Sequence, residues 1–349
     1  MEAFWLYTAL SCFLVLASFR LLRIGRRNLP PSPIPALPII GHLHLLKLPL
    51  HRKLHSLSQK YGPIFSLRFG NRLVVVVSSP SGVEECFTKN DVVLANRPRF
   101  IIGKYIGYNY TTMVGSSYGD HWRNLRRLGA VEIFSASRLN TFLSVRKDEI
   151  RRLLLKLSEN SRQDFAQVEM KSKLAELSFN IIVRMVAGKR YFGEDEDNDE
   201  AKLFRELIEE VFKYAGASNP GDFVPVLRWM DYKNYDKKVA KLSGKMDTFF
   251  EGLIDKHRRN KNSSTMIDHL LSLQESQPEY YTDQIIKGLI MRVVGLALGS
   301  LIQSFEWKRI SEEQIDLAEG NGLTMPKVKP LEAMCKARNI IDKVVLETA

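Results

Sequence analysis

The stretch that decides the fold is YGDHWRNLRR, residues 118–127, which predicts the start of a helix after a long aperiodic region. Trp122 and Arg126 are four residues apart, so on a helix they share one face. An indole N–H and a guanidinium on one face can bind an anionic group such as a carboxylate. The same spacing suits a cation–π pair that caps the core, and because such pairs are common, spacing alone favours this second interpretation.

Downstream of this motif, apolar residues recur at helical spacing over most of the chain. The clearest stripe lies in residues 236–259, with lysines on its polar side, and 194–200 form an acidic cluster that predicts a solvated loop. Residues 283–305 are strongly apolar. A second membrane span there would bury Lys287 and Arg292 at a cost of several kcal/mol, so the pattern favours a buried helix.

Upstream of the motif, residues 64–70 and 73–78 predict two strands joined by a turn at Gly70-Asn71, because the second is rich in β-branched residues. Ser79 and Pro80 are typical of a helix cap and first turn. Residues 99–119 lack periodicity and predict a long loop. Loops of this length in compact domains are often functional.

The amino terminus predicts a membrane anchor. Residues 3–19 are apolar except for small hydroxyl side chains, and four arginines lie within residues 20–27, which would keep the remaining chain in the cytosol. A cleaved signal peptide is the alternative, but it would carry a basic start rather than Glu2. Residues 30–38 then contain five prolines, which predict a stiff, extended hinge at the membrane.

Composition bounds the function classes. The chain has 349 residues with an ordinary globular share of apolar and charged residues, which excludes a disordered or many-pass membrane protein. Its net charge of +12 points to an acidic partner or an anionic membrane. Three widely spaced cysteines argue against a disulfide framework or a zinc site, and they suit a reducing compartment.

Together these segments resemble a plant microsomal cytochrome P-450, a haem-thiolate monooxygenase, over nearly the whole chain. The resemblance is carried by the anchor, the PPSP hinge at 30–33, YGPIF at 61–65, ANRP at 95–98 and the 118–127 motif. Residues 89–91 and 103–109, KND and GKYIGYN, are similar to the isoflavone 2'-hydroxylase-like subgroup.

The resemblance implies a mainly α fold with small β-sheets behind a single amino-terminal membrane helix in the endoplasmic reticulum. It implies haem b with Trp122 and Arg126 on its propionates, and NADPH electrons from a separate reductase. Residues 203–230 would form the roof of the access channel. The implied substrate is a small apolar or phenolic metabolite. Its pocket would draw on the 99–117 loop and the 322–326 turn, with these candidate residues: Tyr105, Tyr108, Met113, Leu323 and Thr324.

The family's axial thiolate has no counterpart here. That cysteine, whose electron donation promotes O–O cleavage, is framed by Phe seven residues before, Gly four before and Gly two after. Cys12, Cys86 and Cys335 all fail this frame, and the oxygen-activating helix breaks off at the Met291–Arg292 junction. The sequence therefore resembles a family member from which one internal block has been removed, as in a spliced or mispredicted product. No residue is assigned as catalytic or as a metal ligand.

This resemblance divides the chain into an anchor at 1–27, a hinge at 28–41, an amino-terminal P-450 part at 42–291 and a carboxyl-terminal part at 292–349. Three functions follow as alternatives. The first is the family's NADPH- and O2-dependent hydroxylation of an isoflavone- or flavonoid-like metabolite. The second, which the missing cysteine favours, is a catalytically dead membrane-bound product or interaction protein. The third, nucleic-acid binding, is disfavoured because the positive charge is spread over many helices.

Overall fold

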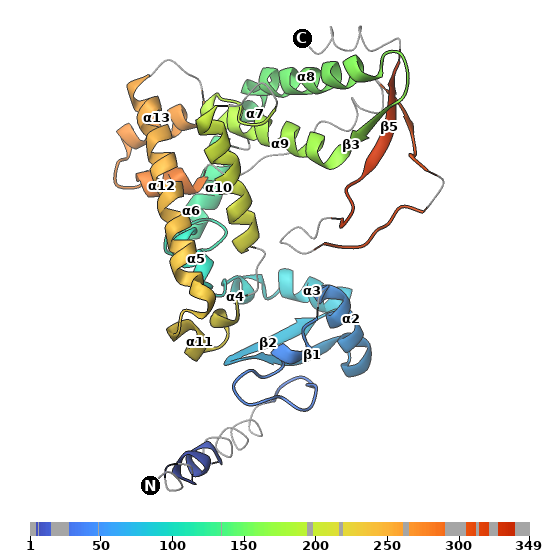
Figure 1. Ribbon diagram of the computed structural model, residues 1–349. Helices are drawn as coiled ribbons and strands as arrows, with labels where there is room; N and C mark the ends of the chain where they lie inside the picture. The colour runs from blue at the N-terminus through green and yellow to red at the C-terminus, as the bar shows by residue number, and fades with distance from the viewer. Residues whose placement is uncertain are drawn as a thin grey trace. The chain divides into compact units, whose positions relative to one another are not determined.

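The computed structural model is mainly helical with short strands, as Figure 1 shows, so the predicted class is confirmed. It divides into two compact units, Met1–Leu94 with Asn219–Lys233, and Ala95–Ser218 with Asn234–Ala349. The residues that the structure describes are 5, 7–14, 28–47, 49–133, 135–193, 198–215, 219–260, 265–289, 305–311, 314–320 and 327–338.

The first unit is built on an antiparallel hairpin of β1 (Ile64–Phe69) and β2 (Arg72–Val77), which confirms the two predicted strands. Gly70 makes the turn with φ +59°, and a side chain there would meet the carbonyl oxygen of Phe223. The other elements of this unit are η1 (Leu43–Leu45), α2 (Leu50–Tyr61), α3 (Pro80–Phe87), α4 (Asp91–Leu94), η3 (Pro220–Asp222) and α11 (Pro225–Trp229). A further turn, η4 (Tyr232–Asn234), follows α11.

Helix α3 begins where the sequence predicts. The Ser79 hydroxyl accepts a hydrogen bond from the Gly82 backbone N–H at 3.2 Å, and Pro80 occupies the first turn, where no intrahelical N–H is needed. On the inner face of the hairpin Phe65 and Leu67 are buried together with Leu57 of α2. The hairpin and α2 therefore share a small core of their own.

The proline-rich segment lies along the outer edge of β1. The backbone N–H of Ser66 donates to the Pro31 carbonyl at 2.8 Å, and the Ser66 hydroxyl donates to the Pro30 carbonyl at 2.9 Å. The buried His42 ring bridges the same edge: Nε2 lies 2.8 Å from the Pro33 carbonyl, and Nδ1 accepts from the Arg68 backbone N–H at 2.7 Å. The segment predicted as a hinge therefore completes one edge of this sheet.

The second unit is helical apart from one small sheet. In Figure 1 α8 (Leu143–Ser161) and α9 (Met170–Ala187) lie side by side, joined through β3 (Ala166–Glu169). The remaining helices are α5 (Ile101–Tyr105), α6 (Asp120–Leu128), the π-helical η2 (Gly129–Ile133), α7 (Ala136–Thr141), α10 (Asp199–Ala215), α12 (Tyr235–Arg259), α13 (Met266–Ser276) and α14 (Asp283–Leu289). The predicted 99–119 loop thus contains one short helix, α5.

The sheet of the second unit has the order β3-β5-β4 and joins distant parts of the chain. Strand β5 (Glu332–Ala337) pairs antiparallel with β3 and with β4 (Phe305–Lys308). Cys335 stands at its centre, opposite Ala166 on one side and Trp307 on the other. Its side chain is 0% exposed and packs in a core formed mainly by α8 and α9.

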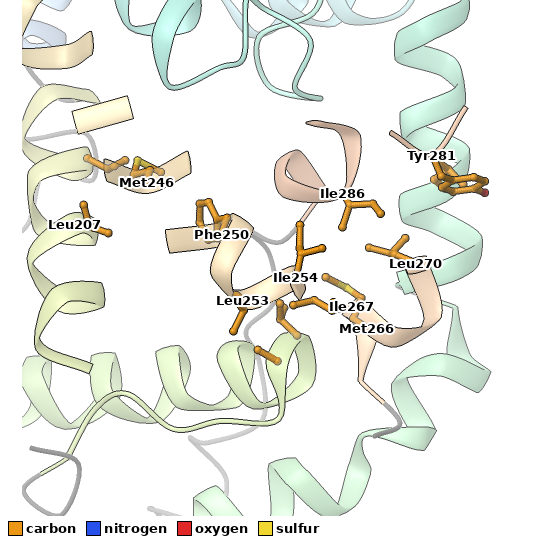
Figure 2. Close-up of a cluster of buried hydrophobic side chains, with 14 of the residues drawn as sticks. Leu207, Met246, Phe250, Leu253, Ile254, Met266, Ile267, Leu270, Tyr281 and Ile286 are labelled. Carbon is orange, nitrogen blue, oxygen red and sulfur yellow. The ribbon is translucent and has the colours of Figure 1, made fainter. Parts of the chain in front are cut away.

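The largest core lies between α6, α10, α12, α13 and α14, and Figure 2 shows part of it. Met246, Phe250, Leu253 and Ile254 of α12 all belong to this core, as the predicted stripe in 236–259 requires, and Figure 2 shows Ile254 beside Ile267. Its neighbours shown in Figure 2 include Leu207, Met266, Leu270, Tyr281 and Ile286. This core fixes the start of α14 against α12.

The acidic cluster at 194–200 was expected to be a solvated loop, but its last two residues are helical and one of them is held by ion pairs. Residues 194–197 lie outside the described part, but Asp199 opens α10 and Glu200 is held by three side chains. Lys189 Nζ and Lys256 Nζ both lie 2.8 Å from its carboxylate, and the Tyr191 hydroxyl donates at 2.5 Å. The local sequence does not predict this ion-pair network, because Lys256 comes from α12, 56 residues further along the chain.

The predicted anchor is described only at Trp5 and residues 7–14, which are helical; 15–27 lie outside the described residues. No helix within the described ranges is long and apolar enough to cross a membrane. Of the apolar 283–305 stretch, α14 and β4 are described, and the Met291–Arg292 junction falls outside the description.

Candidate functional site

The site predicted from the sequence centres on α6, which begins after Gly119 as expected. Leu125 and Leu128 are 2% and 3% exposed and fasten one side of the helix to the main core. Trp122 is half-buried and Arg126 is exposed. The Trp122 ring packs on Tyr118, with ring centroids 5.6 Å apart, and the cation over Tyr118 is Arg123 rather than Arg126. The Arg126 guanidinium is therefore not engaged with the indole.

The 99–117 loop lies on α12 through its tyrosines. The Tyr105 hydroxyl lies 3.5 Å from Asp236 Oδ2, and the Tyr105 carbonyl accepts from the Ser243 hydroxyl at 2.9 Å. The Tyr108 hydroxyl donates to Asp247 Oδ1 at 3.3 Å. Burial, together with the Asp247 carboxylate, raises the pKa of Tyr108, so its hydroxyl keeps its proton as a donor.

Helix α14 holds the same loop from a second side. Gln284 Nε2 donates to the Tyr108 carbonyl at 3.0 Å and to the Thr111 hydroxyl at 3.1 Å. Lys287, only 7% exposed, lies 2.6 Å from the Asp247 carboxylate that also receives Tyr108. The buried lysine is thus neutralised by a carboxylate on the facing helix, which satisfies the ordinary requirement for a buried charge.

The loop also contacts the beginning of α6. His121 Nε2 lies 2.8 Å from the Thr111 carbonyl. Met113 is partly buried and packs against the main core. Three consecutive residues, Tyr108, Asn109 and Tyr110, have positive φ of 46°, 54° and 64°. For non-glycine residues this costs free energy, and such conformations persist only where surrounding contacts impose them.

The structure therefore brings Tyr105, Tyr108 and Met113 together on the surface formed by α12 and α14. Both tyrosine hydroxyls are directed at carboxylates of α12. Leu323 and Thr324, the other two predicted pocket residues, lie outside the described residues. Sequence reasoning did not single out Asp247 and Gln284 for this role. The sequence feature that could have predicted the role of Asp247 is Lys287, because a cation in an apolar helix requires a carboxylate nearby.

A haem-thiolate centre needs two kinds of contact from the protein: polar groups at its propionates and an axial thiolate. Trp122 carries an indole N–H and Arg126 an exposed guanidinium on the same helix, and these are groups that can bind a propionate. An axial thiolate is a different requirement. Cys12 is exposed in the amino-terminal helix, and Cys86 lies in α3 of the first unit.

Cys335 does not supply that ligand either. Burial raises the pKa of its thiol, only partly offset by a hydrogen bond with Ser161, so the neutral form is favoured. Among the described residues, no three His, Cys, Asp or Glu side chains are grouped as metal ligands. Trp122 and Arg126 have groups of the kind that bind a propionate, but none of the three cysteines suits the axial position of a haem-thiolate centre.

Comparison with known proteins gives the family. The sequence model described as "Cytochrome P450" matches residues 30–295. The chain is 50% identical to "Cytochrome P450 81Q32" of Catharanthus roseus over an alignment of 493 residues that covers 99% of each chain. Because this chain has only 349 residues, a long internal part of that relative has no counterpart here.

Two further relatives match a shorter part. An "Isoflavone 2'-hydroxylase" of Glycyrrhiza echinata is 54% identical over 285 residues, which cover 80% of this chain and 57% of the relative. An "Isoflavone 3'-hydroxylase" of Medicago truncatula is 51% identical over 317 residues, which cover 87% and 63%. In these two alignments the chain spans less than two thirds of the relative. From the family match and the full-span relative, the chain belongs to the cytochrome P450 family, in the group that includes the isoflavone hydroxylases.

Proposed function

We propose that this chain is a catalytically silent member of the isoflavone hydroxylase-like P450 group. Its active ancestors in that group would hydroxylate a small phenolic secondary metabolite at the endoplasmic reticulum, using NADPH and O2. The electrons would come from a separate flavoprotein reductase. Relatives named isoflavone hydroxylases, at 51% and 54% identity, support that origin. The single-pass anchor and the four-part division of the chain remain part of this proposal.

The observation that carries the silent state is Cys335. It is the cysteine nearest the carboxyl terminus, and it is fully buried in the middle strand of a sheet. An iron ligand must present its sulfur as a thiolate toward the metal. Cys335 instead packs among Leu154, Leu157 and other apolar side chains of α8 and α9. Haem binding through Trp122 and Arg126 alone would leave the iron without the ligand that drives O–O cleavage.

The test is the reduced carbon monoxide difference spectrum of the full chain in microsomes, with the Catharanthus roseus relative as a matched control. We expect the relative to give a thiolate-type Soret band and this chain to give none. A band from this chain would overturn the proposal. A second sample inserts the relative's unmatched internal block between Met291 and Arg292, and we expect the band to return.

A second candidate, a non-catalytic interaction protein, is favoured by the charge on α12. Lys237, Lys238, Lys241 and Lys245 are all exposed along that helix, and the chain carries a net charge of +12. Such a surface suits an acidic protein partner, for example the reductase. Purified chain added to the Catharanthus roseus relative plus reductase should then slow turnover, and replacing these lysines by glutamate should abolish the inhibition. Unchanged turnover would exclude this candidate.

A further inference from the structure

The amino-terminal part of the chain carries charge of one sign only. Residues 3–83 contain ten Lys and Arg side chains and no Asp or Glu, although the whole chain carries 39 acidic residues. Four of these ten cations follow the apolar run, at 20–27, and the other six lie in residues 47–72. A stretch without carboxylates cannot neutralise its own cations, so this part of the molecule is suited to an anionic partner.

Helix α2 displays basic side chains along its solvent side. Leu54, Leu57 and Tyr61 turn the opposite side of the helix toward the core of the hairpin. The solvent side, which we call the α2 basic face, consists of these exposed residues: His51, Arg52, His55, Ser56, Gln59 and Lys60. They recur every three or four positions, so they form one continuous strip along the helix. No member of the strip carries a negative charge.

The charges at the start of α2 oppose the dipole of that helix. The amino-terminal end of a helix has a partial positive charge, which acidic side chains stabilise. The first turn of α2 contains His51, Arg52 and Lys53 and no acidic residue, and the N-cap Pro49 makes no side-chain hydrogen bond. Positive charges are thus gathered at the positive end of the dipole, where an external anion would reduce their repulsion. Phosphate is one of the anions that bind at this position.

The α2 basic face belongs to the unit from which the chain leads back to the predicted anchor. Pro30 and Pro31 are bound to Ser66 of β1, and α2 packs on the same hairpin, as Figure 1 shows. Arg27, the last of the four arginines, lies three residues before Pro30, which is at most about 11 Å of extended chain. The hairpin therefore holds α2 near the membrane surface into which the predicted anchor would insert.

We propose that the α2 basic face docks on anionic phospholipid headgroups of the membrane that holds the anchor. This inference rests on the membrane location in the proposed function. Arg52 and Lys60 pair with headgroup phosphates and carboxylates, and each cation near such a surface strengthens docking about fivefold. The tether favours lipid over an acidic protein, because it presents α2 to its own membrane at a high effective concentration. The lysines of α12 lie in the other unit and are not part of this face.

The first test measures docking with an environment-sensitive dye on the α2 basic face. A full chain with Cys12→Ser, Cys86→Ser and Ser56→Cys is labelled at residue 56, since Cys335 is buried. It is reconstituted in phosphatidylcholine vesicles with increasing shares of phosphatidylserine. We expect the emission to shift to the blue as phosphatidylserine increases, and to shift back in about 1 M NaCl, where the Debye length is about 3 Å. Identical emission in all vesicles would overturn the proposal.

The second test locates the contact on the protein. Arg52→Gln together with Lys60→Gln removes two cations from the face and should lower the docking equilibrium constant about 25-fold. Lys237→Gln together with Lys241→Gln is the matched control, because it removes the same charge from exposed positions of α12. The control should change the constant less than about twofold. Equal losses in the two double variants would contradict the proposal. Far-ultraviolet circular dichroism verifies that each variant is folded.

The outcomes separate this proposal from the proposed function. Alkaline carbonate extraction of the membranes tests the anchor alone, because contacts between charges do not survive it. If the chain were extracted, its cosedimentation with the same vesicles, and the loss of cosedimentation in the Arg52→Gln, Lys60→Gln variant, would still decide the role of α2. The carbon monoxide spectrum depends on neither result. A dye response that required added reductase instead of phosphatidylserine would identify an acidic protein as the partner and would overturn the proposal.

Discussion

Replacing Glu200 by glutamine should destabilise the second unit at neutral pH and progressively less as the pH falls. Burial alone would raise the pKa of Glu200, but hydrogen bonds from Lys189, Lys256 and Tyr191 outweigh burial and lower that pKa from 4.5 to about 2. Because the folded pKa is below the unfolded one, the stabilisation is fully present above about pH 5 and is lost between there and pH 2.

The magnitude follows from this pKa difference. At about 1.4 kcal/mol per pKa unit, the difference has a ceiling of roughly 3 kcal/mol. The Glu200 side chain is 30% exposed, so solvent screening reduces the expected loss in Glu200→Gln to about 2 kcal/mol at pH 7. Glu206→Gln is the matched control, because Glu206 is an exposed carboxylate on the same helix α10.

The assay is urea unfolding of the full chain in detergent, followed by circular dichroism at 222 nm at several pH values from 7 to 3. The difference in unfolding free energy between parent and Glu200→Gln should decrease steadily below pH 5. The Glu206→Gln control should stay within about 0.5 kcal/mol of the parent. A difference that is the same at pH 7 and pH 3, or a Glu206→Gln effect of equal size, would refute the reasoning.

Three other predictions concern buried polar contacts. Glu149→Gln should cost about 3 kcal/mol of unfolding free energy, because its 2%-exposed carboxylate pairs with both Arg184 and Arg190 and an amide removes the charge that they share. Urea unfolding measures this loss, and a value below about 1 kcal/mol would contradict the prediction. Burial lowers the pKa of His42, so the contact of the proline-rich segment with β1 should weaken as the pH falls below about 6.5. Hydrogen exchange at the Arg68 amide should then become faster than its intrinsic pH dependence predicts. An exchange rate that follows only the intrinsic pH dependence would contradict this prediction. Lys287→Met should remove the cation that neutralises Asp247 and should raise the hydrogen-exchange rate in the 99–117 loop severalfold. If only the amides of α14 exchanged faster, the prediction that Lys287 stabilises the loop would be wrong.

Local patterns predicted the elements whose stabilising contacts are local. The Ser79–Pro80 cap, the β1–β2 hairpin and the apolar stripe of α12 all depend on residues within a few positions of one another, so their sequence spacing specifies them. The motif at 118–127 likewise predicted the start of α6 and placed Trp122 and Arg126 on that helix.

The remaining features depend on partners far away in the sequence. Strand β5 pairs with β3, whose residues lie more than 160 positions earlier in the chain, and strand pairing at that separation leaves no periodic signal in the sequence. Tyr105 and Tyr108 were predicted to face a substrate. That role stays a prediction, but their hydroxyls contact Asp236 and Asp247, which are eleven residues apart and so lie on one side of α12 after about three turns. These hydroxyl–carboxylate contacts depend on how the loop packs on α12, which the sequence does not show.

The hydrogen bonds between the proline-rich segment and β1 determine where the chain can be shortened for biochemical work. A soluble form that begins after Gly41 would lose the carbonyls of Pro30, Pro31 and Pro33 and would leave Ser66 and His42 without acceptors. The outer edge of β1 would then be unprotected, and precipitation on expression would be the expected outcome. A form that begins at Asn28 removes the apolar run while it preserves every one of these contacts. The start of the folded body is therefore at the first proline of the segment, twelve residues before the point that composition alone suggests.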